Sequence, residues 1–256
     1  MAIANACEWA APTPASRVEE IYYRARYFIN GCPALYMPLV RHQHRYAVDR
    51  VVTPDTDLVI EAFGRTGTTF ANFAFLAAQT RRVRTVHHTH ASAQVIAAVK
   101  MQIPTLVIVR RPLEVALSHM VRHQISASAA LAAWIHFHQR IMPYREAMVL
   151  CSFEQMTSNF TPVIERVNEK FDTGFAVWQH TRENEAAIFE QIKLRNRGLF
   201  AKNATVERMR SLSLPTAERE AQKQRLSNHL QADSLAPLSK KAQRLYQTLL
   251  QGTQVN

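Results

Sequence analysis

The stretch that decides the fold is residues 58–78, which read LVIEAFGRTGTTFANFAFLAA. It opens with the apolar, β-branched run Leu58, Val59 and Ile60, turns through GRTG at residues 64–67, and continues as a run of Ala, Phe and Leu. This order predicts a strand, a tight loop and a helix. Glycines let the backbone fold closely around a ligand, and a helix start offers unpaired N–H groups. The stretch therefore predicts a binding site for a phosphate or sulfate group, with an ordinary βα turn as the alternative.

The composition allows one large α/β domain and favours an anionic ligand. The chain has 256 residues, 47% of them apolar, and a formal charge of +11, so we expect a single domain over residues 1–256. Cys7, Cys32 and Cys151 are far apart and show neither metal-ligand nor disulfide spacing. The first residues lack the basic segment of a signal peptide, and no apolar run is long enough to span a membrane. We therefore expect a cytoplasmic protein.

Strand-like and helix-like segments alternate along the middle of the chain. Residues 1–50 read as a helical lead-in, with a helix starting at Ser16 as N-cap, and residues 55–175 read as the α/β core. The expected strands are residues 58–60, a short strand within residues 85–90 whose end carries the histidines, residues 105–109 and residues 148–153. The expected core helices follow the first loop, cover residues 91–100, begin at Pro112, and cover residues 127–147. Residues 176–256 read as a helical C-terminal part, with helices at 183–194, 215–230 and 239–250 and a lid loop at 195–203.

This alternation predicts an α/β fold with a parallel, doubly wound sheet flanked by helices. Ligands of such sheets bind beyond the carboxyl ends of the strands. The glycine loop, the histidines His88 and His90, and Arg110 all fall at such ends. We therefore expect these three features to meet in one cleft.

Four motifs together resemble the sulfotransferases that use 3′-phosphoadenosine 5′-phosphosulfate (PAPS). The family's 5′-phosphosulfate loop is matched by GRTGTTF at residues 64–70, and its 3′-phosphate element by RRPLEVALS at residues 110–118. Two looser matches are FEQM at residues 153–156 and RNRG at residues 195–198. The resemblance covers about residues 57–203 and implies a P-loop NTPase-like sulfotransferase fold. A Walker A loop is absent, which disfavours a nucleoside-phosphate kinase.

The resemblance implies which residues bind PAPS and its product, adenosine 3′,5′-bisphosphate. They are Arg65, Thr66, Gly67, Thr68, Thr69, Phe70, Arg110, Ser118, Phe153, Arg197 and Gly198. Arg110 has a planar fork that suits a phosphate, and Phe70 and Phe153 have rings that can line an adenine pocket. Alternatives are a core role for Phe70, a helix-internal hydrogen bond for Ser118, and a surface ion pair for Arg110.

The catalytic residues implied by the resemblance are His90 and Arg65. Many family members place a histidine base at the end of the second strand as K-T-H, and here the sequence is His88-Thr89-His90. His90 is the expected base, His88 takes the lysine position, and Arg65 is expected to stabilise the departing oxygen. Other branches use a glutamate as base, but Glu61 precedes the loop and reads as too far back along its strand. The family works without a metal, and we expect none here.

The acceptor cannot be read from these motifs. We expect a hydroxyl or amine of a small molecule, saccharide or lipid, with no nucleic acid partner and no membrane span, and an oligomer is compatible with the sequence. The alternative is a non-catalytic nucleotide or nucleic-acid binding protein that uses the same basic anion site.

Overall fold

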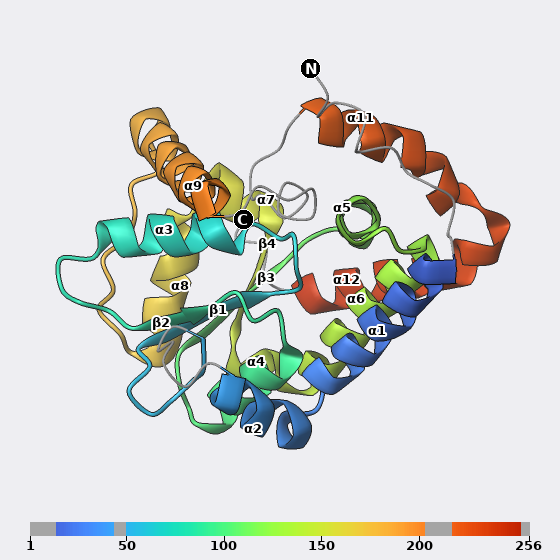
Figure 1. Cartoon of the computed structure of the whole chain (residues 1–256). Helices are drawn as coiled ribbons and strands as arrows, with labels where there is room; N and C mark the ends of the chain where they lie inside the picture. Colours follow the sequence, from blue (N-terminus) through green and yellow to red (C-terminus); the bar gives the residue numbers. More distant parts are fainter. Residues whose placement is uncertain (1–13, 44–49, 203–216, 252–256) are drawn as a thin grey trace.

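Four parallel strands form one sheet in the part of the chain that this computed structural model describes, residues 14–43, 50–202 and 217–251. The strands are β1 (Leu58–Ala62), β2 (Thr85–His87), β3 (Thr105–Val109) and β4 (Val149–Ser152), in the spatial order β2-β1-β3-β4. Figure 1 shows helices on both faces of this sheet. The predicted parallel, doubly wound α/β sheet is therefore confirmed.

The order of the strands places a crevice next to the central pair. After β1 the chain crosses to β2 on one side, and then returns past β1 to β3 and β4 on the other. The register pairs Ile60 with Leu106 and Ala62 with Ile108, so β1 and β3 end at the same edge. The segments that leave these two strands diverge there, which is where doubly wound sheets bind ligands.

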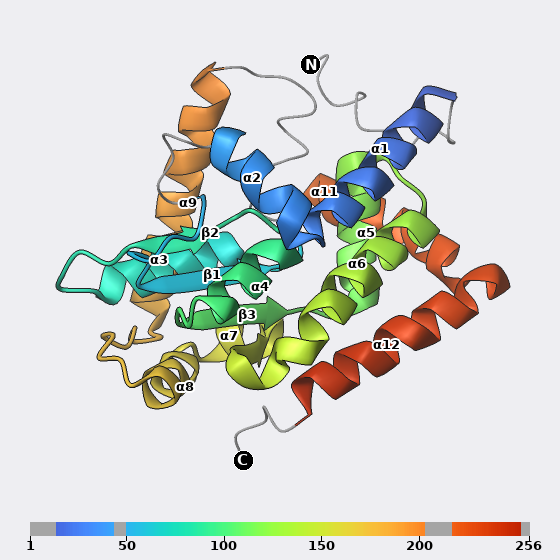
Figure 2. The same ribbon diagram turned by 90° about the horizontal axis from the view of Figure 1, so that it is seen from below.

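The helices divide into two layers and a C-terminal group, visible in Figures 1 and 2. Alternate strand residues point to opposite faces: Leu58 and Ile60 pack in one core cluster with α3, α8 and α9, and Val59 packs in another with α2 and α4. Helix α12 packs on α5 and α6. The bounds of the α-helices are α1 (Pro14–Asn30), α2 (Pro33–Gln43), α3 (Thr68–Ala78), α4 (Ser92–Lys100), α5 (Pro112–His123), α6 (Ala127–Ile141), α7 (Phe153–Ser158), α8 (Thr161–Phe171), α9 (Arg182–Lys202), α11 (Ala217–Leu226) and α12 (Ala236–Leu250). Short 3₁₀ turns cover Met142–Ala147, Ser227–Gln231 and Asp233–Leu235.

Two boundaries near the end of the core differ from the sequence-based expectation. The helix expected over residues 127–147 ends at Ile141, and a 3₁₀ turn follows because Pro143 cannot continue the α-helical hydrogen bonds. Phe153 does not end a strand but begins α7. Ser152 and Gln155 form a capping box at the start of that helix, so the strand stops at Ser152.

Two helices near the termini also differ in their bounds. Helix α1 begins at Pro14 rather than after Ser16. The expected helix at residues 215–230 is described from Ala217, and its last turn is a 3₁₀ helix. No helix among the described residues is both long enough and apolar enough to cross a membrane.

The prediction of a lid loop at residues 195–203 is wrong for residues 195–202, because α9 continues through Lys202. Gly198 lies within this helix, where a glycine costs about 1 kcal/mol relative to alanine and does not by itself end the helix. Ile188 and Ile192 are buried against the sheet-side core and anchor the helix. Asn203 falls outside the described residues.

Candidate functional site

A cavity of about 520 Å³ lies at the carboxyl edge of the sheet, where β1 and β3 end. Its volume is within the range of about 300–1,000 Å³ that is usual for sites of small ligands. The residues that line it come from the first loop, α3, the β2–α4 segment, α5, α7, α9, α1 and α11. They include Arg26, Arg50, Arg65, Thr66, Gly67, Thr68, Thr69, Phe70, His88, His90, Arg110, Ser118, Arg122, Phe153, Met156, Phe189, Arg195 and Asn196.

The loop after β1 is held in a conformation that brings its backbone to the cavity. Arg65 has φ 68° and Gly67 has φ 80°, both in the left-handed region. The Thr66 hydroxyl donates to the Phe63 carbonyl at 2.5 Å, which fixes the turn. The N-cap of α3 is Gly67, which makes no side-chain cap hydrogen bond, and the start of a helix offers backbone N–H groups to a ligand. Such a loop can bind an anionic oxygen group.

The side chains of Gly67's neighbours explain why glycine is needed there. A Cβ at this position would lie 2.8 Å from Met156 Cε and 3.0 Å from the Phe153 ring. A side chain would therefore clash with α7 in addition to straining the backbone. Phe153 and Met156 pack against the loop and form an apolar wall of the cavity.

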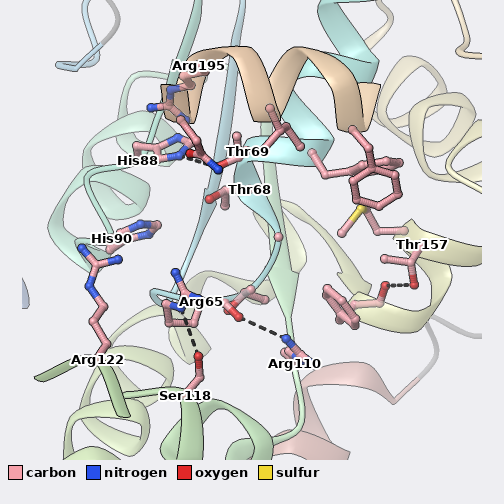
Figure 3. A pocket seen from close by; sticks show the side chains of 18 of the residues that line it. Arg65, Thr68, Thr69, His88, His90, Arg110, Ser118, Arg122, Thr157 and Arg195 are labelled. Carbon is pink, nitrogen blue, oxygen red and sulfur yellow. Dashed lines mark hydrogen bonds between the residues drawn. The ribbon is translucent and has the colours of Figure 1, made fainter. Parts of the chain in front are cut away.

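The second anion position is Arg110, at the end of β3. Its guanidinium lies over the Phe153 ring, with Cζ 4.0 Å from the centroid, and pairs with Glu114 at 2.9 Å. Its Nη1 also donates to the carbonyl of Arg65 at 3.4 Å (Figure 3). The ion pair expected as the alternative is therefore present, but the same guanidinium lines the cavity and contacts the first loop.

Ser118 of α5 contacts the first anion position. Its Oγ accepts a hydrogen bond from Arg65 Nε at 3.0 Å (Figure 3). The structure thus gives Ser118 a partner from the first loop rather than its own helix backbone. Arg65 and Ser118 both line the cavity, so a phosphate there can contact the pair.

His90 is held as a neutral imidazole at the cavity wall. Its Nδ1 lies 2.9 Å from the carbonyl oxygen of Ala62. Because a carbonyl only accepts, the proton is assigned to Nδ1, which leaves Nε2 as the proton-accepting nitrogen. Burial lowers the pKa of His90 to about 4, and the nearby cations Arg122, Arg26 and Arg50 act in the same direction. At neutral pH the ring can therefore serve as a base.

Glu61, which the sequence reading set aside, positions the segment that carries His90. Its carboxylate is fully buried and accepts hydrogen bonds from the Thr89 N–H at 2.8 Å, the Thr89 hydroxyl at 2.6 Å and the His90 N–H at 3.1 Å. Burial raises the pKa of Glu61 to about 7, while the hydrogen bonds from Thr89, Ala62 and His90 act in the opposite direction. Glu61 does not line the cavity, so its role is to hold the backbone.

His88 occupies the position at which the resemblance expects a lysine. Its Nε2 is 2.8 Å from Thr69 Oγ1 (Figure 3), and burial lowers its pKa far below the usual range. His88 and His90 have φ 66° and 53°, and with Arg65 they place three left-handed non-glycine residues at one site. Strained backbone of this kind clusters at functional sites. His88 therefore contributes a neutral hydrogen-bonding group, not a permanent charge.

Phe70 and the basic motif of α9 differ in part from the expectation. Phe70 is 7% exposed and packs against Trp178 and Phe189, so the core interpretation describes most of its surface, although it also borders the cavity. Arg197 and Gly198 are exposed and do not line the cavity. Their contacts with a donor therefore stay a prediction.

In the RNRG motif of α9, the residues that do line the cavity are Arg195 and Asn196, and Glu185, Phe189 and Ile192 of the same helix line it as well. In a helix, successive side chains point about 100° apart. Arg195 and Asn196 therefore face the cavity, while Arg197 and Gly198 are exposed. Arg122 was also missed, although it lies four residues after Ser118 on α5. That spacing places both on one helix face and is a signal the sequence contains.

The described residues contain no cluster of three or more His, Cys, Asp or Glu side chains that could hold a metal ion. Cys32 and Cys151 are free thiols, and burial raises the pKa of Cys151 to about 12. Cys7 falls outside the described residues. Cys151 therefore behaves as a small apolar side chain of β4.

No protein-family model matches the chain, and no curated protein matches it. Among solved structures, the chain is similar to mouse sulfotransferase SULT7A1 complexed with PAP, at 10% sequence identity and a TM-score of 0.39. The match covers 79% of this chain and 95% of the mouse chain. Similarity at this level does not decide a function, which must come from the chemistry of the site.

Proposed function

We propose that this protein is a sulfotransferase that transfers a sulfuryl group from PAPS to a hydroxyl or amine. The observation that carries the proposal is the placement of two anion positions and a neutral histidine around one cavity. The loop with Arg65 follows β1, Arg110 follows β3, and His90 follows β2. PAPS has two anionic poles and an adenine, which match these positions.

The chemistry of the lining residues fits such a donor in three parts. Arg65 and the N–H groups at the start of α3 suit the 5′ phosphosulfate. Arg110 and Ser118 suit the 3′ phosphate, with Arg110 already oriented by Phe153 and Glu114. The apolar wall of Phe153, Met156 and Phe189 suits the adenine.

The donor supplies a sulfuryl group on a phosphate leaving group. For the transfer, His90 Nε2 takes the proton of the acceptor hydroxyl while the acceptor oxygen bonds to sulfur and the sulfur–phosphate oxygen bond breaks. Arg65 stabilises the negative charge that develops on the departing phosphate oxygen. Arg65 remains protonated throughout at neutral pH, so it acts by charge and not as an acid. The products are the sulfated acceptor and adenosine 3′,5′-bisphosphate.

A thermal-shift experiment separates this function from the non-catalytic alternatives. Adenosine 3′,5′-bisphosphate at about 100 times its Kd should stabilise the protein by about 2.7 kcal/mol without added metal. ATP–Mg²⁺ and an oligonucleotide serve as the comparison ligands. Stabilisation by ATP–Mg²⁺ alone, or by the oligonucleotide with a steep salt dependence, would contradict the proposal. A labelled-sulfate transfer assay with PAPS then tests catalysis.

A further inference from the structure

A buried histidine that the proposed mechanism does not use contacts the loop after β1 from inside the fold. His119 of α5 is 1% exposed, and its Nε2 lies 3.0 Å from the carbonyl oxygen of Gly64. Its ring also stacks on Phe63, with the two centroids 4.7 Å apart and the planes at 24°. His119 does not line the cavity, so it can influence a bound ligand only through the loop.

The hydrogen-bond partners of His119 determine which ring nitrogen carries the proton. Burial lowers the pKa of His119 well below its ordinary value, and His123 acts in the same direction, so the ring is neutral at pH 7. Because the Gly64 carbonyl only accepts, the proton is assigned to Nε2. Nδ1 then accepts from the hydroxyl of Tyr23, 2.8 Å away on α1. A chain of two hydrogen bonds therefore runs from α1 through His119 to the loop.

Two consecutive residues of α5 hold two consecutive residues of this loop. His119 donates to the carbonyl of Gly64, and Ser118 accepts from Arg65 Nε at 3.0 Å. A trans peptide points its C=O and its N–H in opposite directions, so the bond from His119 also sets the direction of the Arg65 N–H. The contact thus fixes the orientation of the first peptide unit of the GRTG turn.

The residue that follows this peptide has an unfavourable backbone conformation. Arg65 has φ 68°, which for a residue with a Cβ persists only when the surroundings hold it. The peptide before Arg65 is held by His119 at the Gly64 carbonyl, and the peptide after it by Arg110 Nη1 at the Arg65 carbonyl, 3.4 Å away. With both flanking peptides held, the dihedral angles of Arg65 are fixed before any ligand arrives.

Resting on the proposed transferase function, we propose that His119 is a positioning residue for the donor. It holds the loop in the conformation that receives the 5′ phosphosulfate, so the donor does not have to order the loop when it binds. Without the bond from Nε2, the buried Gly64 carbonyl lacks its donor and the turn rearranges to satisfy it. Only the fraction of molecules that keep the original turn then binds the 5′ group with full affinity.

The test compares two nucleotides that differ only in the group at the 5′ position. Adenosine 3′,5′-bisphosphate reaches both anion positions, whereas adenosine 3′-monophosphate lacks the phosphate that the loop would bind. Calorimetry on the full chain at pH 7 gives both affinities, and their ratio measures the contribution of the loop. A general loosening of the fold weakens both nucleotides, but a misplaced loop weakens only the bisphosphate.

Variants of His119 assign that contribution to its hydrogen bond. H119L keeps an apolar group of similar size and removes the donor, so it should weaken the bisphosphate about tenfold or more and leave the 3′-monophosphate unchanged. H119Q places an amide N–H near the position of Nε2 and should restore most of the lost affinity. The matched control is H138L, because His138 is also fully buried but bonds to Trp134 of its own helix and does not line the cavity.

G64A disturbs the same contact from the loop side and reports even if H119L does not fold. Gly64 has no positive φ, so alanine is compatible with its backbone. The added Cβ would lie 3.0 Å from His119 Nε2, which forces the ring away from the carbonyl. G64A should therefore weaken the bisphosphate more than the 3′-monophosphate, as H119L does.

The outcomes separate the two proposals. If the wild type does not bind the bisphosphate, or binds both nucleotides equally, the donor assignment fails and the role of His119 fails with it. If the wild type prefers the bisphosphate and H119L and G64A keep that preference, only the positioning role is overturned. Equal losses for the two nucleotides in H119L, or the same selective loss in H138L, would also overturn it.

Discussion

The buried carboxylate of Glu61 accepts a hydrogen bond from the backbone N–H of His90 at 3.1 Å, so an interior residue of β1 holds the segment that carries the proposed base. The same carboxylate binds both the N–H and the hydroxyl of Thr89. These contacts fix a segment in which His88 and His90 have positive φ, a conformation that is unfavourable without such support.

Glu61→Gln should lower turnover while donor binding survives. The amide nitrogen of Gln would face one of the N–H donors that the carboxylate now accepts, which displaces His90. We expect kcat to fall about tenfold or more, because small misplacements of a base are costly. Steady-state kinetics gives kcat, and calorimetry with the bisphosphate gives donor affinity. An equal loss of both quantities would point to general unfolding of the site instead.

His90→Ala should depress turnover about 10²-fold or more while leaving bisphosphate binding intact, because it removes the general base. In the wild type, the lowered pKa of about 4 predicts that kcat/KM stays flat from neutral pH down to about pH 5 and then falls as Nε2 becomes protonated. An inflection near pH 6.5 would show that the ring is not shielded as described. As a control for acid inactivation, samples are held at low pH, returned to neutral pH and then assayed.

Arg110→Ala should weaken bisphosphate binding by more than about 1.5 kcal/mol, the value expected for a charge-assisted contact. The matched control is Arg111→Ala. Arg111 pairs with Glu154 at 3.2 Å and does not line the cavity, so its loss should leave binding unchanged. Isothermal titration of the two variants decides the matter. Equal affinities in both would remove Arg110 from the donor site.

Gly67→Ala and Gly198→Ala should change stability in opposite directions. At Gly67 the positive φ and the approach of Met156 should make alanine destabilising by about 1–2 kcal/mol or more. Gly198 lies within α9, where an added Cβ meets nothing within 4 Å, so alanine should stabilise by about 0.5–1 kcal/mol. Urea denaturation measures both. Destabilisation by Gly198→Ala would contradict the helical assignment of residues 195–202.

Acid should destabilise the protein through buried neutral histidines. His138 is fully buried, its Nδ1 lies 2.8 Å from the Trp134 carbonyl, and burial lowers its pKa to about 3. Between about pH 6.5 and 4 the unfolded chain binds a proton at this residue and the folded chain does not. Stability therefore falls with falling pH, by about 3 kcal/mol from His138 alone.

The raised pKa of Glu61 makes its own contribution to stability grow as the pH falls from about 7 to 4.5, which opposes the effect of His138. The test therefore compares the wild type with a variant that lacks His138. Urea denaturation of the wild type and His138→Leu at pH 7 and pH 5 gives the difference due to His138. The loss of stability on acidification should be smaller in His138→Leu. Identical losses would show that His138 titrates normally.

The local pattern of residues 58–78 was sufficient to predict β1, the loop and α3, because apolar runs and glycine spacing are properties of the chain itself. The same holds for β3 before Arg110 and for the helix opened by Pro112. Local pattern failed in residues 195–202, where packing of α9 against α3 overrides a basic, glycine-containing sequence. The sequence prediction therefore named Arg197 and Gly198, whereas Arg195 and Asn196 line the cavity.

The sequence by itself determined the parallel α/β sheet and the edge at which its loops meet, because alternating strands and helices make the strands parallel and bring their carboxyl ends to one edge. Only the tertiary structure decided how these parts cooperate. It hydrogen-bonded Glu61 to the backbone of His90, hydrogen-bonded Arg65 to Ser118, and brought Arg26 and Arg122 to the same cavity. These relationships join residues far apart in the chain, and they exist only once the helices pack on the sheet.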